Sequence, residues 1–134
     1  MAVKRVLLDT SAYSYLMRGS KGVTDLLNNA DDVLLCSVVV GELLSGFKKG
    51  ENEKRNKMIL DDFLTVTNVS IVSIDDVTAE RYAVILDFLR RQGTPIPTND
   101  LWIAACAMQH GLTLITGDRH FTLVPQIITQ TATL

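Results

Sequence analysis

The stretch Pro97-Thr-Asn-Asp-Leu-Trp-Ile-Ala-Ala105 places two polar residues, Asn99 and Asp100, directly before a run with almost no polar side chain until Gln109. A helix that is apolar on every side is buried on every side. The stretch therefore predicts a core helix that begins deep inside the molecule with a carboxylate at its start. The rest of the chain must explain why a negative charge stands there.

Short apolar runs elsewhere in the chain predict buried strands, because each lies close to a turn or helix-start signal. These runs are residues 6–8, 33–36, 69–74 and 112–115. Helical patterns fill the gaps at residues 53–65 and 80–91, and weaker ones at 11–18, 22–29 and 38–48. Continuously apolar strands that alternate with helices indicate a parallel sheet covered on both faces. We expect an α/β protein with a doubly wound α/β/α arrangement and a short, mainly parallel sheet of four or five strands.

Composition limits the class of protein. With 134 residues, 47% of them hydrophobic and 21% charged, and no linker-like or repeated segment, the chain predicts a single globular domain over residues 1–134. The net charge of -2 argues against a surface that binds nucleic acid everywhere, so a polyanion would need a local patch. The apolar runs are too short for a signal peptide core or a membrane span, which predicts a cytoplasmic protein. Cys36 and Cys106 lack zinc-type spacing and are expected to be buried free thiols.

Four carboxylates occupy comparable places in this predicted fold. Asp9 and Asp118 each follow a predicted strand, Glu42 is the only charge in an apolar helical run, and Asp100 precedes the core helix. Each acid alone is explained as a cap, a turn residue or a solvent-facing helix position. Ligands of doubly wound sheets, however, gather at the carboxyl ends of the strands. We therefore expect the four acids to face one cleft.

Such a cluster needs a cation. Two carboxylates ~4 Å apart repel by about 4 kcal/mol at an effective dielectric constant of 20. Oxygen ligands favour Mg²⁺ or Mn²⁺ over zinc, so Asp100 is best explained as a metal ligand. Sequence motifs for phosphate loops, serine nucleophiles and zinc proteases are absent. His110 precedes Gly111 at a helix end and is expected to be structural, whereas His120 is either a surface loop residue or a contact for substrate phosphate.

Four segments together resemble the PIN-domain ribonucleases, and among them the VapC-type toxins of toxin-antitoxin pairs. They are Leu8-Asp-Thr-Ser11, the apolar helix with Glu42, Pro97–Ala105 and Leu114-Ile-Thr-Gly-Asp-Arg-His-Phe121. The resemblance runs from about Val6 to Phe121 and implies a Mg²⁺- or Mn²⁺-dependent endoribonuclease that forms a homodimer and is inhibited by a VapB-type antitoxin. Residues 125–134 match no motif.

The resemblance also assigns roles to individual residues. It implies that the catalytic acids are Asp9, Glu42, Asp100 and Asp118, with supporting polar side chains from Thr10, Asn99 and Thr116. The metal ion would be held chiefly by Asp9 and Asp100, with Asp118 contributing directly or through water. Glu42 would position or deprotonate the attacking water. Arg119 is the expected contact for the phosphate backbone of the RNA.

Three alternatives remain at this point. The first is a non-catalytic PIN-like binding module. The second is a housekeeping RNA-processing nuclease without an antitoxin. The third is a phosphatase-like domain that uses a strand-terminal Asp. The last is disfavoured, because Ser11 rather than a second Asp follows Asp9 at the second position and no Lys ends a late strand.

Overall fold

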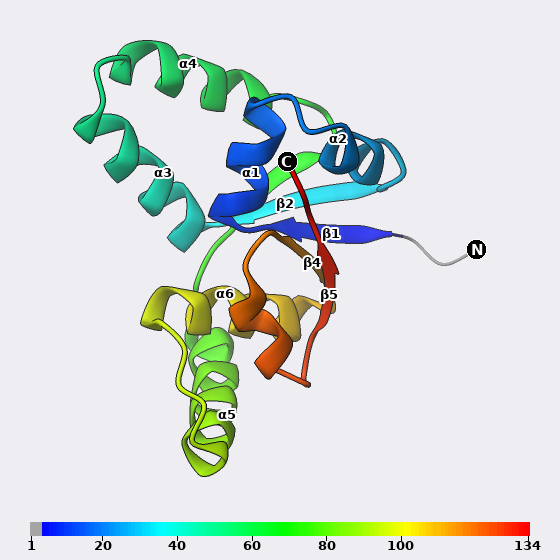
Figure 1. The fold of residues 1–134 in the computed structure, drawn as a ribbon, viewed down its shortest axis with the longest axis vertical. Coiled ribbons are helices and arrows are strands. Elements are labelled where there is room, and N and C mark those ends of the chain that lie inside the picture. The colour runs from blue at the N-terminus through cyan, green and yellow to red at the C-terminus, as the bar shows by residue number, and fades with distance from the viewer. Residues whose placement is uncertain (1–3) are drawn as a thin grey trace.

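The computed structural model describes residues 4–134 as a five-stranded sheet with helices on both faces (Figure 1). This confirms the predicted α/β fold with a parallel sheet. The strands are β1 (Arg5–Leu8), β2 (Asp32–Cys36), β3 (Val69–Val72), β4 (Thr113–Thr116) and β5 (Ile128–Thr131). The helices are α1 (Thr10–Met17), α2 (Lys21–Asn28), α3 (Ser37–Lys49), α4 (Glu53–Leu64), α5 (Asp76–Gln92) and α6 (Thr98–His110), followed by the short 3₁₀ helix η1 (Arg119–Leu123).

The strand order decides where a ligand can bind. The order is β3-β2-β1-β4-β5, and every neighbouring pair is parallel. The chain winds outward from β1 to β3 and then returns past β1 to β4. Because crossovers are right-handed, α1 to α4 cover one face of the sheet while α5 and α6 cover the other (Figure 1). The order reverses between β1 and β4, so the binding edge lies beyond Leu8 and Thr116.

Helix α6 forms the centre of the second layer. Leu101 and the five residues from Ile103 to Ala107 are buried, which confirms the predicted core helix. Trp102 stacks on Tyr82 of α5, with ring centroids 4.2 Å apart, and so joins the two helices of this layer. The prediction that α6 begins deep inside the molecule is wrong, because residues 97–99 are exposed. The helix enters the core from the edge of the sheet, where its first polar residues remain in water.

The edge strand β5 was not predicted. Its sequence, Ile-Thr-Gln-Thr, has no apolar run, and most of its residues are exposed because only one neighbour, β4, pairs with it. Ile128 is 72% exposed. Residues 125–134, which match no motif, thus close one edge of the sheet.

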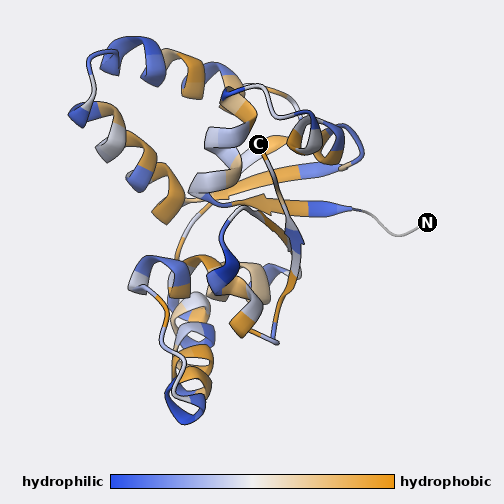
Figure 2. Ribbon diagram, in the orientation of Figure 1, coloured by the Kyte–Doolittle hydropathy of each residue, from blue (hydrophilic) through white to orange (hydrophobic). Residues whose placement is uncertain are grey.

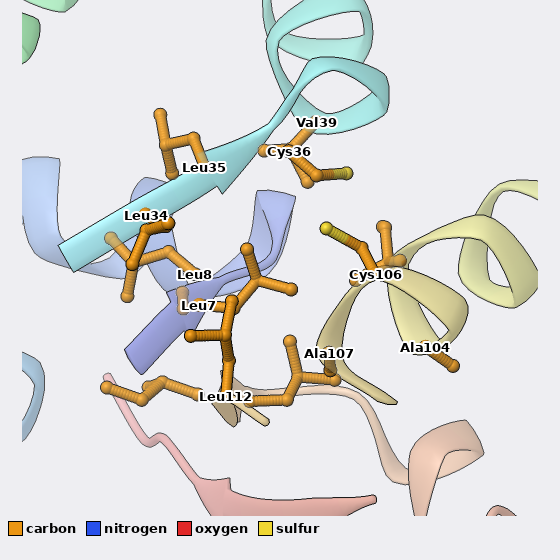
Figure 3. Packing of buried hydrophobic residues seen from close by; sticks show 14 of the residues in the cluster. Leu7, Leu8, Leu34, Leu35, Cys36, Val39, Ala104, Cys106, Ala107 and Leu112 are labelled. Atoms are coloured by element: carbon orange, nitrogen blue, oxygen red, sulfur yellow. The ribbon is translucent and has the colours of Figure 1, made fainter. Parts of the chain in front are cut away.

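Apolar residues concentrate between the layers. Figure 2 shows hydrophobic strands in the middle of the molecule and hydrophilic residues at the far ends of α4 and α5. Cys36 and Cys106 are buried free thiols, as predicted, and Figure 3 shows their sulfur atoms turned toward each other across the core. Within residues 4–134 none of the helices has the length and hydrophobicity required to cross a bilayer.

Candidate active site

Asp9 is the first residue after β1 and caps the N-terminus of α1. Its Oδ1 atom accepts hydrogen bonds from the backbone N–H of Ala12 at 2.8 Å and from the hydroxyl of Ser11 at 2.6 Å. Its Oδ2 atom accepts a hydrogen bond from the Thr116 hydroxyl at the end of β4. Asp9 is only 4% exposed. Burial raises its pKa, and the three hydrogen bonds oppose this shift by favouring the ionised form.

Two hydrogen bonds hold the turn after β4 next to the Asp9 carboxylate. The backbone N–H of Gly117 donates to the Ser11 hydroxyl at 2.9 Å, and that of Asp118 donates to the Thr116 hydroxyl at 2.9 Å. A Cβ atom on Gly117 would lie 2.4 Å from Cε2 of Tyr15, so any other residue here would force the Tyr15 ring to move. We call Asp9, Ser11, Thr116 and Gly117 the inner cluster.

Ser11 and Gly117 are parts of this arrangement that sequence reasoning missed. The available signal was the hydroxyl two residues after Asp9, a common partner of a helix-capping acid. The bond from Gly117 could not be read from the sequence, because it joins residues 106 positions apart.

Glu42 lies on α3 and connects three helices. Its Oε1 atom accepts a hydrogen bond from the Thr10 hydroxyl of α1 at 2.6 Å, and its Oε2 atom accepts one from Asn99 Nδ2 of α6 at 3.2 Å. Two residues predicted to support the site, Thr10 and Asn99, thus contact this one carboxylate. Glu42 and Asn99 also line an open hollow of about 510 Å³ that extends along α3 past Ser45 to Lys49.

Asp100 and Asp118 meet at His120. The carboxylate of Asp118 accepts a hydrogen bond from the backbone N–H of His120 at 2.9 Å and so caps the start of η1. His120 Nδ1 then lies 3.1 Å from Asp118 Oδ1 and 3.2 Å from Asp100 Oδ2. The exposed fractions of the side chains increase from Asp100 at 17% to Asp118 at 36% and His120 at 49%. We call Glu42, Asp100, Asp118 and His120 the outer cluster.

The four predicted acids interact electrostatically. Burial is the largest cause of a raised pKa at Asp100, and the negative charges of Asp118 and Glu42 raise it further, while His120 lowers it. The charge of Asp118 also contributes to the raised pKa of Asp9. The acids therefore face the same edge of the sheet, at the point where the strand order reverses.

Three members of the outer cluster, Asp100, Asp118 and His120, have donor atoms that fit a divalent cation. One atom each from Asp100, Asp118 and His120 falls within a group whose members all lie within 4.8 Å of one another. Carboxylate oxygens and an imidazole nitrogen are established ligands of divalent metals. Asp9, which the resemblance makes a chief ligand, lies outside this group, and both of its oxygens accept hydrogen bonds from the protein. Arg119, the expected phosphate contact, is exposed beside Asp118.

Comparison with known proteins agrees with this fold. Residues 6–126 match the PIN domain, a span that contains every residue of the inner and outer clusters. The chain therefore belongs to the PIN-domain family.

Several relatives within that family are named VapC. The chain is 30% identical over 129 residues to Ribonuclease VapC2 of Haemophilus influenzae, which covers 94% of this chain and 96% of the relative. It is 27% identical over 129 residues to the tRNA(fMet)-specific endonuclease VapC of Shigella flexneri, with the same coverage. Among solved structures, a chain of VapBC2 from Rickettsia felis, bound to a DNA fragment from its promoter, has a TM-score of 0.85 and 25% identity. That match covers 96% of this chain and 98% of the other.

Proposed function

We propose that this protein is a metal-dependent endoribonuclease that hydrolyses RNA phosphodiester bonds as the toxin of a type II toxin-antitoxin pair in the cytoplasm. The observation that carries the proposal is the pair of carboxylates Asp100 and Asp118, which share one imidazole at the open carboxyl edge of a PIN-family sheet. The relatives named as VapC ribonucleases, which match nearly the whole chain, support the same reaction.

The cofactor in this proposal is Mg²⁺ or Mn²⁺. Asp100 and Asp118 would hold the ion, and the buried charge of Asp9 behind them would strengthen the attraction for it. A bound divalent ion lowers the pKa of its water and neutralises charge on a phosphoryl oxygen.

The remaining residues position the reactants. Hydrogen bonds from Thr10 and Asn99 fix both oxygens of Glu42, so this carboxylate is held ready to accept a proton from the attacking water. The guanidinium of Arg119 would contact a phosphate of the RNA, because Arg pairs with phosphate oxygens through two parallel hydrogen bonds.

We propose a VapB-type antitoxin as the inhibitory partner and a homodimer as the form of the toxin. An edge with four carboxylates attracts a cationic side chain, and Arg is best suited because its guanidinium pairs with carboxylates in a fixed geometry. A small protein encoded beside this chain, with a basic and partly disordered C-terminal segment, should co-purify with it and block cleavage. If no such protein binds or inhibits, the housekeeping nuclease is the better description.

The direct test is cleavage of total RNA by protein freed of any partner, with the cut ends mapped. We expect discrete cuts in Mg²⁺ or Mn²⁺ and none in EDTA, and none by the matched variant Asp100→Asn. Cuts that persist in EDTA would contradict the metal mechanism. A partner-free protein that cuts no RNA with either metal would favour the non-catalytic binding module.

A further inference from the structure

We propose that His120 is a ligand of the metal ion, which gives the site a mixed nitrogen and oxygen donor set and a preference for Mn²⁺ over Mg²⁺. This inference rests on the proposed function, because it concerns the same metal site. It adds the imidazole of His120 to the carboxylates that were expected to bind the ion. Sequence reasoning left His120 as a loop residue or a phosphate contact.

The backbone aims the imidazole into the site. The N–H of His120 donates to Asp118 Oδ1 at 2.9 Å, which fixes the start of η1. The next residue, Phe121, is 1% exposed and anchors the turn in the core. Between these two attachments the side chain of His120 has its Nδ1 atom against one oxygen of Asp118 and one of Asp100. A rearrangement of the backbone is therefore not needed to bring the nitrogen to the ion.

The geometry also matches the exposure expected of a ligand at the mouth of the site. Asp100 is the most buried member of the group and His120 the most exposed, so the three donors surround a point that opens to solvent on the His120 side. Water and an RNA phosphate would approach from that open side. Three protein ligands leave coordination positions for such oxygens, because ions of this kind take about six ligands.

The identity of the donors sets the metal preference. Mg²⁺ is a hard ion that is bound almost entirely through oxygen, whereas first-row transition ions accept imidazole nitrogen. An imidazole in place of a further oxygen favours Mn²⁺ over Mg²⁺. Loss of the imidazole should therefore weaken the binding of Mn²⁺ more than that of Mg²⁺.

A different role for the same contact predicts the opposite sign. If the imidazole occupies the position of the cation only in the metal-free protein and leaves when metal binds, then it competes with the ion. In that case its removal would tighten the binding of both ions. The effect of His120→Ala on metal affinity thus separates a ligand from a competitor.

The test uses full-length protein without a histidine tag, with Mn²⁺ alone as the probe. Electron spin echo measurements on bound Mn²⁺ report a directly ligated nitrogen through modulation by its ¹⁴N nucleus. We expect this modulation in the wild type and its loss in His120→Ala. The control variant is His110→Gln, which changes the chain's other histidine at the C-terminal end of α6 and should keep the modulation. The Mn²⁺ dissociation constant of His120→Ala should rise about tenfold or more, the lower range for disturbing a metal site, and that for Mg²⁺ should rise less.

Two results would overturn the ligand alone. They are wild-type protein that binds Mn²⁺ without nitrogen modulation, and a His120→Ala variant that binds Mn²⁺ as tightly as the wild type or tighter. Metal-dependent RNA cleavage by the same preparation would then show that the proposed function stands without this ligand. Wild-type protein that binds no Mn²⁺ at all would also overturn the ligand, and protein that binds neither Mn²⁺ nor Mg²⁺ would overturn the metal-dependent function with it.

Discussion

The inner and outer clusters hold their carboxylates in different ways. In the inner cluster Asp9 is buried, and both of its oxygens accept hydrogen bonds from donors fixed in α1 and at the end of β4. In the outer cluster Asp100 and Asp118 share His120 as a side-chain partner and are partly exposed. The inner carboxylate is therefore satisfied by the fold itself, whereas the outer pair is open to exchange its partner for an ion.

This difference separates two tasks at one edge of the sheet. The inner cluster joins β1, α1 and the turn after β4, and so sets the shape of the edge. The outer cluster uses that shape to present charge to solvent. Substitutions in the inner cluster should mainly change stability, and substitutions in the outer cluster should mainly change metal binding and catalysis.

The largest effect is expected at Asp100. Asp100→Asn removes a charged ligand but keeps the shape of the side chain, so RNA cleavage should fall by at least about a hundredfold, since a metal ion supplies several kcal/mol to such a transition state. The initial rate of cleavage in Mg²⁺ or Mn²⁺ is the measurement, with circular dichroism to confirm folding. Cleavage at the wild-type rate by a folded variant would remove Asp100 from the site.

A matched pair of threonines tests the division most sharply. Thr116→Val keeps the volume of a buried side chain but removes the donor to Asp9 and the acceptor for Asp118 N–H. Leaving buried polar groups without partners costs about 1–3 kcal/mol, so the free energy of unfolding should fall by that amount. Urea denaturation of the metal-free protein measures it. An unchanged midpoint would show that the inner cluster does not hold the edge together.

The counterpart next to the outer cluster is Thr10→Val, because the Thr10 hydroxyl donates to Glu42. Glu42 loses one hydrogen bond but is only half-buried, so water can replace the hydroxyl and the free energy of unfolding should change by less than about 1 kcal/mol. Turnover should nevertheless decrease because the Glu42 carboxylate is less well oriented, while the Mn²⁺ affinity stays near that of the wild type. A loss of stability as large as that of Thr116→Val would erase the distinction between the clusters.

A smaller effect is expected from pH in the absence of metal. The folded-state pKa of Asp100 is raised above its ordinary value of 3.8, mainly by burial, so the folded protein holds this proton more tightly than the unfolded chain. The resulting stabilisation is complete below the ordinary pKa and is lost as pH rises through the folded-state pKa. In EDTA, Asp100→Asn should therefore melt at or above the wild type near pH 7, with a smaller advantage near pH 4. An advantage that grows on acidification would contradict the raised pKa.

Much of the fold could be predicted because its signals are local. The apolar runs that became β1 to β4 and the helical patterns between them are properties of short segments, and their alternation predicted the parallel sheet. The strand β5 could not be predicted in this way. Because β5 is an edge strand whose side chains are mostly exposed, its sequence, Ile-Thr-Gln-Thr, contains no apolar run.

The site also has features that could be predicted from the sequence and features that could not. The positions of Asp9 and Asp118 follow from a general rule, since residues after β1 and β4 must lie at the edge where strand order reverses. The contact of Ser11 with Gly117 and that of His120 with Asp100 do not follow from it. They depend on the turn at Gly117 and on η1, which bring together groups far apart in sequence, and no pattern in a single segment encodes that geometry.

The most direct test of the account is the effect of Mn²⁺ on the melting temperature of the wild type and of Asp100→Asn. An ion that binds only the folded state at a hundred times its dissociation constant stabilises it by about 2.7 kcal/mol, which corresponds to a shift of roughly 10 °C for a domain near this size. The account predicts such a shift for the wild type and a much smaller one for the variant. A wild type that gains nothing from Mn²⁺, or a variant that gains as much as the wild type, would show that the outer cluster is not a metal site.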